Sequence, residues 1–302
     1  MLLTSPAASP DTPAMAISGL CRAPRNHILR ELVKEIWVLR SEAGDAAEIL
    51  PAAPSAELVF SLGADTVWTR EGGARAELCG HFLSGPRTGY RSMRSKGGVH
   101  YVAASLRPGA ALRLFGPDSA GWADEDLEVG LLPGRLASEL SALAEDLAAV
   151  DSPEGGPAED AARIDLLEAW LSGRDLHEPS PDDARIASVL GLVATGRCRL
   201  SSAASLADYL GVGLKRLERA SFRLYGLGPK ALLRLGRFER AQRASIVGAA
   251  SSGTSRTAPP EGGDIDWANL ALELGFSDQS HLVREFRAFS SLSPEAWRRA
   301  SA

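Results

Sequence analysis

The chain of 302 residues is poor in cysteine and has no long apolar run. Its three cysteines, Cys21, Cys79 and Cys198, are widely spaced and odd in number. This pattern excludes a disulfide framework and a CxxC zinc ribbon, and it favours a reducing cytoplasm. The longest apolar runs fall far short of the roughly 20 residues that a membrane helix needs. The start, MLLTSPAASPDTPA, has no basic segment and no long apolar core, so we expect neither a signal peptide nor a membrane partner.

Signatures of catalysis and of metal binding are also missing from the first half. His27, His81, His100 and His177 form no His-x-His pair, so we expect no cupin-type metal site and no cofactor. The chain has no nucleophile elbow and no Walker-type glycine loop. Cys79 is interpreted as a buried thiol, and a redox sensor is the alternative. We therefore expect that the protein is not an enzyme.

The net charge of −5 hides an asymmetry between the two halves. Residues 1–181 carry 16 Lys and Arg against 26 Asp and Glu, whereas residues 182–302 carry 17 against 12. An acidic half joined to a basic half indicates that only the second half meets a polyanion.

The pattern of residues predicts an α+β protein of two domains. Residues 1–19 are expected to be a flexible tail, and 20–178 a β-rich domain whose C-terminal part is helical. The expected helices of that part cover 137–150 and 161–173, and a linker with two prolines follows at 174–183. Residues 182–302 are expected to be all α. Short β-branched or aromatic runs, which predict strands of a barrel or sandwich, cover 36–40, 57–63, 66–70, 77–85 and 98–109.

Two segments of the helical half share one pattern, at about 202–226 and 266–290. In each, a short helix reaches a Leu-Gly turn, an apolar residue follows, and a second helix begins. Gly211 and Gly275 occupy the turn, which favours a positive φ that glycine tolerates. Gly213 and Ser277 stand at the start of the second helix, where serine is a good N-cap and glycine offers no side chain. The pattern predicts two helix-turn-helix units, whose second helices can enter the major groove of DNA.

The second unit is the more specific of the two. The segment LGFSDQSHLVREF (residues 274–286), with Leu292-Ser293-Pro294 and Trp297 after it, resembles the DNA-binding domain of AraC/XylS-type transcriptional regulators. Leu217-Glu218-Arg219, Gly226-Leu227-Gly228-Pro229 and Arg237-Phe238 fit the first unit and the connecting helix of that family. The resemblance covers about residues 185–300. It implies two recognition helices held by a rigid connecting helix in successive major grooves of one DNA face.

The chain departs from the family pattern at four places. Gly213 replaces the usual serine cap of the first unit. Ser221 stands where an aromatic residue is common, with Phe222 beside it, so the packing of that helix could be shifted. Ser291 replaces a usual glycine. An insert at 248–264 lengthens the connection between the units and puts their spacing in question.

The first half carries a weaker resemblance to a β-rich domain that precedes this DNA-binding domain in some regulators. Ile49-Leu50-Pro51, the strand at 57–60, Gly98–Val102 and Leu106–Ala110 carry it. The resemblance implies a small cupin-like barrel with trailing helices that binds an effector, dimerises, or does both. A candidate effector pocket, for which plain core packing is an equal alternative, is made of Trp37, Phe60, Trp68, Phe82 and Tyr101.

On this resemblance, Gln279 and Arg284 are expected to read bases, since Gln pairs with adenine and Arg with guanine. Lys215 and Arg216 read bases or hold phosphates, and Arg219 is either a contact or structural. Arg287, Arg298 and Arg299 are phosphate candidates that position the protein. The expected DNA-binding residues are Lys215, Arg216, Arg219, Asp278, Gln279, Ser280, Arg284, Arg287 and Arg298.

These features together predict a bacterial-type, sequence-specific transcriptional regulator that responds to an effector through its first domain. Its partners would be promoter DNA, a small-molecule effector and, if it activates, RNA polymerase. Two recognition helices in one chain can span two grooves, so a homodimer is compatible but not required. Two alternatives stay open: an enzyme whose catalytic barrel is targeted to DNA, and a protein-interaction module that has lost DNA binding.

Overall fold

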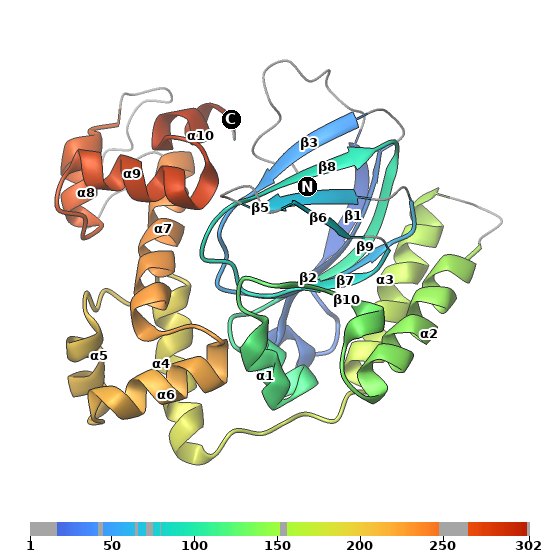
Figure 1. Ribbon diagram of the computed structural model, residues 1–302, viewed down its shortest axis with the longest axis horizontal. Helices are drawn as coiled ribbons and strands as arrows, with labels where there is room; N and C mark the ends of the chain where they lie inside the picture. Colours follow the sequence, from blue (N-terminus) through green and yellow to red (C-terminus); the bar gives the residue numbers. More distant parts are fainter. Residues whose placement is uncertain are drawn as a thin grey trace.

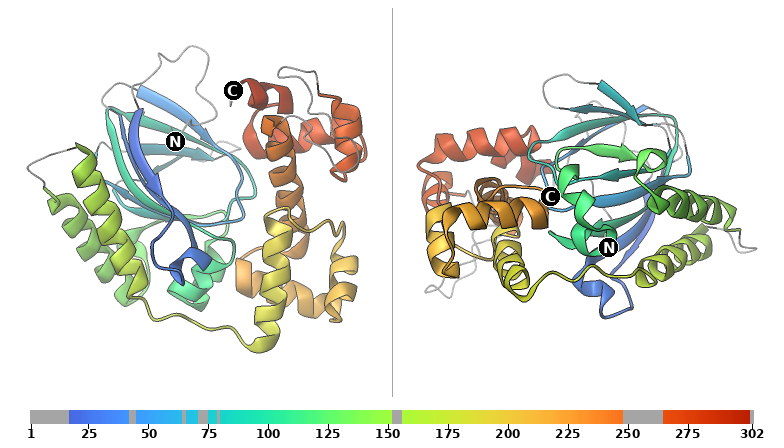
Figure 2. Two further views of the ribbon diagram at one scale, coloured as in Figure 1. Left: turned by 180° about the vertical axis from the view of Figure 1, so that it is seen from behind. Right: turned by 60° about the horizontal axis from the view of Figure 1, so that its bottom comes forward.

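The computed structural model describes residues 17–41, 45–63, 66–70, 75–78, 80–151, 156–247 and 265–300. A β-rich region with two covering helices forms the first part, and a helical region forms the second (Figure 1). An extended stretch joins them, and it can be followed from α3 to α4 in both views of Figure 2. The two-part α+β organisation is therefore present.

The β-rich region consists of two antiparallel sheets. One has the strand order β1-β2-β9-β4-β7-β10 and the other β3-β8-β5-β6. The strands are β1 (Ile17–Arg22), β2 (Val33–Ser41), β3 (Asp45–Leu50), β4 (Glu57–Ser61), β5 (Thr66–Arg70), β6 (Arg75–Leu78), β7 (Phe82–Ser84), β8 (Arg91–Lys96), β9 (Val99–Leu106) and β10 (Asp126–Glu128).

Two expectations need correction here, and a third stays a prediction. Among the described residues the strands pair within two sheets that pack against each other, and closure into a barrel remains an expectation. The run 77–85 is not one strand, because the chain turns at Gly80 (φ +83°) and continues into the other sheet. The tail predicted for 1–19 is too long, since β1 begins at Ile17; residues 1–16 lie outside the described part.

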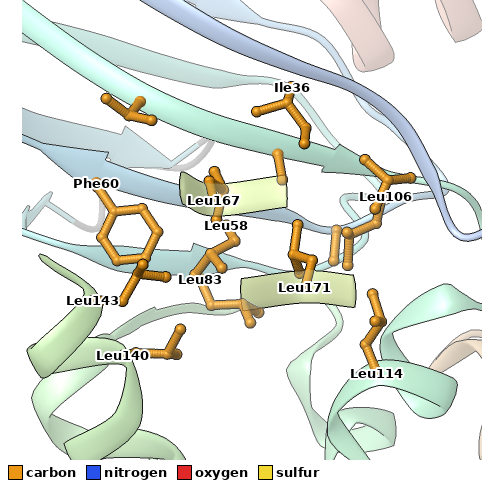
Figure 3. Packing of buried hydrophobic residues seen from close by; sticks show 14 of the residues in the cluster. Ile36, Leu58, Phe60, Leu83, Leu106, Leu114, Leu140, Leu143, Leu167 and Leu171 are labelled. Carbon is orange, nitrogen blue, oxygen red and sulfur yellow. The ribbon is translucent and has the colours of Figure 1, made fainter. Parts of the chain in front are cut away.

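Alternation along the strands sends side chains to two different cores. Leu58 and Phe60 of β4 point from the six-stranded sheet toward α2 (Arg135–Ala149) and α3 (Gly156–Ser172), and Figure 3 shows Phe60 beside Leu143. Val59, between them, packs with residues of both sheets on the inner face. The helices predicted at 137–150 and 161–173 thus cover the outer face of this sheet with their apolar sides.

Four short helical elements connect the strands and helices of the β-rich region. They are η1 (Leu29–Glu31) between β1 and β2, α1 (Ala110–Phe115) and η2 (Pro117–Trp122) between β9 and β10, and η3 (Val129–Leu131) between β10 and α2. Helix α4 (Pro181–Ala194) begins inside the predicted linker, because Pro181 suits the first turn and the Ser180 hydroxyl accepts a hydrogen bond from the Asp183 N–H (3.2 Å).

The helical region is built around one apolar cluster to which all of its helices contribute. These helices are α4, α5 (Ala203–Leu210), α6 (Leu214–Tyr225), α7 (Pro229–Val247), α8 (Trp267–Glu273), α9 (Gln279–Ser290) and α10 (Pro294–Ala300). The pairs α5–α6 and α8–α9 lie at opposite ends of α7 (Figure 1). No helix within the described residues is long and apolar enough to cross a membrane.

The C-terminal ends of α6 and α9 both contact the β-rich region. The Ala52 N–H, from the loop between β3 and β4, donates to the Phe289 carbonyl in the last turn of α9 (2.7 Å). Ala52 is buried in the helical core. At the end of α6, a Cβ on Gly226 would lie 2.8 Å from the Ala120 carbonyl oxygen of η2. The N-terminal ends of α6 and α9 point away from the sheets (Figure 1).

Candidate nucleic-acid interface

Both helix pairs turn at the glycine that the sequence predicts. Gly211 has φ +63° and Gly275 has φ +85°, in the left-handed region that glycine adopts without strain. A Cβ at Gly211 would meet no heavy atom within 4 Å, so the backbone angle alone requires glycine there. We call α5–α6 the first unit and α8–α9 the second unit.

The residue after each glycine closes the turn in the same way. The Val212 N–H donates to the Ala207 carbonyl (3.0 Å), and the Phe276 N–H donates to the Ala271 carbonyl (2.9 Å). These bonds satisfy carbonyls at the end of the first helix, which otherwise lack an intrahelical donor. Phe276 is buried, and its ring meets the His281 ring edge to face with centroids 5.4 Å apart. His281 is thus a packing residue.

Helix α7 fixes the second unit in the fold. Arg234 of α7 makes two hydrogen bonds to the Glu285 carboxylate of α9 (2.9 and 2.8 Å). Burial alone would raise the pKa of Glu285, but the bonds from Arg234 outweigh it and lower that pKa. The Phe238 ring packs against Phe286 (5.0 Å between centroids), and Arg240 donates to the Leu274 carbonyl at the turn (3.2 Å). The sequence did not predict these polar contacts of α7, because the two residues in each contact are far apart in the chain.

The caps of the two second helices differ. Gly213 is the N-cap of α6 and offers no side-chain hydrogen bond, as expected. The N-cap of α9 is Asp278, which corrects our assignment of Ser277. The Asp278 carboxylate accepts from the His281 N–H (2.7 Å) and from the Ser277 hydroxyl (3.1 Å), and these bonds lower its pKa. Asp278 therefore supports the helix start, and its expected contact with DNA stays a prediction.

The first turns of α9 present polar side chains to solvent. Gln279, Ser280, Arg284 and Arg287 are all exposed. Within the described residues, none of these four side chains makes a hydrogen bond or an ion pair. They are free to contact a ligand. Gln279, Ser280 and Arg284 lie in the N-terminal half of α9, which points away from the sheets, and Arg287 lies in the last turn of the helix (Figure 1).

The corresponding face of α6 is partly occupied. Arg216 pairs with Asp182 (2.6 Å), and Arg223 pairs with Asp183 (2.6 Å), where both aspartates belong to the start of α4. Arg219 lines the same hollow between α4 and α6. Lys215 is exposed and has no partner among the described residues. One of the three expected cations of the first unit, Arg216, is thus paired with an acidic side chain of the chain itself.

Arg298 lies on α10, where it pairs with Glu295 of the same helix (3.3 Å) and keeps 28% of its side chain exposed. Arg299 is more open, with 74% of its side chain exposed. Neither side chain belongs to a second helix of a unit, and the expected role of both as phosphate contacts stays a prediction.

The structure does not gather the five aromatic residues of the candidate effector pocket in one place. Phe60 belongs to the core between the six-stranded sheet and the helices, on the opposite face from the rest. Trp37, Phe82 and Tyr101 lie together between the two sheets. The side chain of Trp68 lies outside the described part, as does Cys79. Phe60 is therefore removed from the pocket because of strand alternation.

The space between the sheets also holds a charged network that sequence reasoning missed. Arg87 donates to Ser84 (3.0 Å) and faces Glu57 (3.4 Å), and Ser84 donates to Asp126 (2.7 Å). Asp126 pairs with Arg91 (2.7 Å), with 2% and 4% of the two side chains exposed. The sequence signal that could have revealed this network is the presence of charged residues within the strands β4, β8 and β10. Among the described residues, no cluster of three or more His, Cys, Asp or Glu is placed to hold a metal ion.

Comparisons with known proteins find one matching family and several similar solved structures. Residues 22–128 match a family described as a domain of unknown function, DUF6597. A search of curated proteins finds no match. The chain is similar to the solved structure of ToxT from Vibrio cholerae O395, with 12% identity, a TM-score of 0.45, and 88% of this chain and 96% of that chain covered.

Two other solved structures are similar over most of the chain. Unsaturated fatty acid bound ToxT from Vibrio cholerae strain SCE256 has 10% identity, a TM-score of 0.43, and 94% coverage of both chains. The AraC-like transcriptional activator CuxR has 13% identity, a TM-score of 0.27, and coverage of 75% of this chain and 87% of that chain. The function proposed below rests on this chain's own residues.

Proposed function

We propose that the protein is a sequence-specific DNA-binding transcriptional regulator of the AraC/XylS type. It binds promoter DNA through both helix-turn-helix units and performs no chemistry. The observation that carries the proposal is the first half of α9. There Gln279, Ser280 and Arg284 are exposed and have no partners in the part of the chain that the structure describes, on a helix that carries the signature of the family. Side chains of these types bond to base edges and phosphates.

The arrangement of the two units supports the proposal. The units share a turn geometry and one apolar core, and α7 holds them at its two ends. Helix α7 is about 28 Å long at 1.5 Å per residue, which is comparable with the roughly 34 Å between successive major grooves on one face. One chain can therefore place α6 and α9 in adjacent grooves.

The two units take different parts. In α9, Gln279 and Arg284 read bases, and Arg287 holds a phosphate. In α6, Lys215 is free to contact DNA, whereas Arg216 must first exchange Asp182 for a phosphate. Phosphate contacts supply most of the affinity, and the base contacts of α9 supply most of the discrimination.

The β-rich region senses an effector or mediates dimerisation in this proposal. Its inner face, with Trp37, Phe82 and Tyr101, is the remaining part of the predicted pocket. RNA polymerase is a partner if the protein activates transcription. A homodimer is compatible with two units per chain but is not needed to span two grooves.

The test is the selection of bound sequences from a random duplex library with the full-length protein at near-physiological salt. We expect a motif with two contacted segments about one helical turn apart. Arg284→Ala should cost about 1–3 kcal/mol of binding free energy and relax the preferred base at one position. Arg298→Ala is the matched control, which should weaken binding equally on all sequences.

Each outcome decides one part of the proposal. Equal loss on all duplexes for Arg284→Ala would make that side chain a phosphate contact only. No change for Arg298→Ala would remove α10 from the interface. Failure of the wild-type protein to bind any duplex at low salt would contradict the proposal and favour a protein-interaction module.

A further inference from the structure

Helices α6 and α9 begin in the same way, so their residues can be compared position by position. Gly213 and Asp278 are their N-caps. The Gly213 carbonyl accepts a hydrogen bond from the Leu217 N–H (3.1 Å), and the Asp278 carbonyl accepts one from the Leu282 N–H (3.1 Å). Leu217 and Leu282 are both fully buried in the helical core. The two helices therefore share one register, counted from their caps.

The first residue after the cap differs in chemistry between the two helices. It is Leu214 in α6 and Gln279 in α9, and both residues are exposed. Leu214 keeps 44% of its surface exposed, and it is not a member of the apolar cluster that the described helices share. The side chain of Leu214 is therefore available to an outside partner.

The position of Leu214 identifies that partner, and this step rests on the proposed DNA binding. In helix-turn-helix proteins the N-terminal residues of the second helix are the ones that contact base edges. The N-terminal ends of α6 and α9 both point away from the sheets (Figure 1). Gln279 is proposed to read a base from this position of α9, so Leu214 reaches the corresponding base in the groove that α6 enters.

A leucine reads a base differently from a glutamine, because its side chain has no hydrogen-bond donor or acceptor. In the major groove, thymine is the base that presents an apolar group, its C5-methyl. Against the other bases a leucine would cover a donor or an acceptor without replacing its bond to water, which is unfavourable. A leucine at this position therefore favours thymine.

We propose that Leu214 is a specificity-determining residue that selects thymine through van der Waals contact with its methyl group. The two units then read DNA in two ways. Helix α9 bonds to polar base edges through Gln279 and Arg284, whereas α6 recognises a methyl group through its first residue. The half of the site that α6 enters contains a thymine whose methyl group contributes to the affinity.

The test replaces thymine by uracil, which lacks only the C5-methyl and keeps the hydrogen-bonding groups. The duplex is the one that the full-length protein selects from the random library, and Arg284→Ala identifies the half that α9 reads. Fluorescence anisotropy then measures affinity with one uracil at a time in the other half. We expect one of these uracils to weaken binding of the wild-type protein about fourfold, the contribution of one buried methyl group.

Two variants of Leu214 follow the contact from the protein side. Leu214→Ala should bind the thymine and uracil duplexes within about 1.5-fold of each other, because the shortened side chain no longer reaches the methyl group. Leu214→Gln should instead select adenine at that position, the base proposed for Gln279. Leu131→Ala is the matched control, since Leu131 lies on η3 of the β-rich region with 79% of its surface exposed, and it should keep the full loss on uracil.

The inference is overturned if no uracil weakens binding of the wild-type protein, if Leu214→Ala stays as sensitive as the wild type, or if Leu131→Ala loses the sensitivity as well. The measured quantity is a ratio between two duplexes, so a partly unfolded variant changes both affinities and leaves the ratio readable. A protein that selects no motif would contradict the proposed function, and this inference with it. A protein that selects a motif in both halves but ignores the methyl group would keep the function and lose only this contact.

Discussion

The two helix pairs, α5–α6 and α8–α9, share a turn geometry but differ in how their second helices are held. Helix α9 begins at an aspartate cap and presents free side chains, whereas α6 begins at glycine and two of its arginines pair with α4. The two second helices also differ in the residue that they bury at one corresponding position. Phe286 of α9 is buried, while the corresponding Ser221 of α6 is buried and its hydroxyl donates to the Leu227 carbonyl (2.6 Å). The same turn thus supports one helix with a capped start and free side chains, and one whose surface charge is already partly compensated.

The largest difference should come from the aromatic residues of the two helices. Phe286→Ala should lower the free energy of unfolding by about 3–5 kcal/mol, because it removes a buried ring that contacts Phe238 and Trp297. Phe222→Ala, whose ring in α6 is 56% exposed, should change it by less than about 0.5 kcal/mol. Chemical denaturation measures both. Equal losses would show that Phe222 packs in solution, and the comparison would fail.

A second prediction concerns the acidic partners of α6. Asp182→Asn with Asp183→Asn removes the charges that pair with Arg216 and Arg223. Affinity for any duplex should rise about threefold at low salt, and the salt dependence should become steeper, because more phosphate contacts release counterions. Fluorescence anisotropy at two salt concentrations measures this. Asp118→Asn, on η2 of the β-rich region, is the control; an equal rise there would mean that net charge alone is responsible.

A smaller effect is expected at the cap of α9, and it depends on pH. The pKa of Asp278 is lowered in the folded protein, mainly by the His281 N–H. Its contribution to stability is therefore complete above the ordinary pKa of an aspartate and is lost as the pH falls below about 4. Asp278→Ala should lower the denaturation midpoint at pH 7 and remove that part of the acid sensitivity. A variant with an unchanged acid profile would show that another carboxylate is responsible.

The smallest effect is expected where the two helices end. Helix α6 ends at Gly226 (φ +70°) and α9 ends at the corresponding Ser291 (φ +66°), which is strained for a residue with a side chain. Ser291→Gly should stabilise the protein by about 1 kcal/mol. The reverse change, Gly226→Ser, should destabilise it, because the added Cβ would meet the Ala120 carbonyl at 2.8 Å. Thermal unfolding of the two variants compares them, and a loss on Ser291→Gly would contradict the strain.

Local constraints made part of this structure predictable. The turn glycines Gly211 and Gly275 follow from backbone angles that few other residues tolerate, and the helices follow from apolar spacing. The departure at Ser291 was visible for the same reason. The N-cap was misplaced by one residue, because Ser277 and Asp278 are both good caps and only the geometry of the turn selects between them.

Contacts between distant segments could not be predicted. Strands β3 and β8 pair across some 40 residues, and nothing in either sequence specifies that register. Phe60 was grouped with Trp37 because both are aromatic, although the alternation in β4 sends Phe60 to the helices. Likewise Arg216 reads as a free cation until α4 brings Asp182 beside it. Composition gives the residue type, and only the fold gives its partner.

The contacts of α6 and α9 with the β-rich region have a mechanical consequence. Because one helix ends on η2 and the other accepts a backbone hydrogen bond from Ala52, the distance between them is fixed by the sheets as well as by α7. A closed triangle of this kind resists shear better than a single rod. On a site whose grooves do not match that distance, the duplex would have to bend, since the protein would yield only by breaking an edge of the triangle. If the protein binds DNA as proposed, the β-rich region would then make binding depend on how easily the duplex bends at positions that no side chain touches.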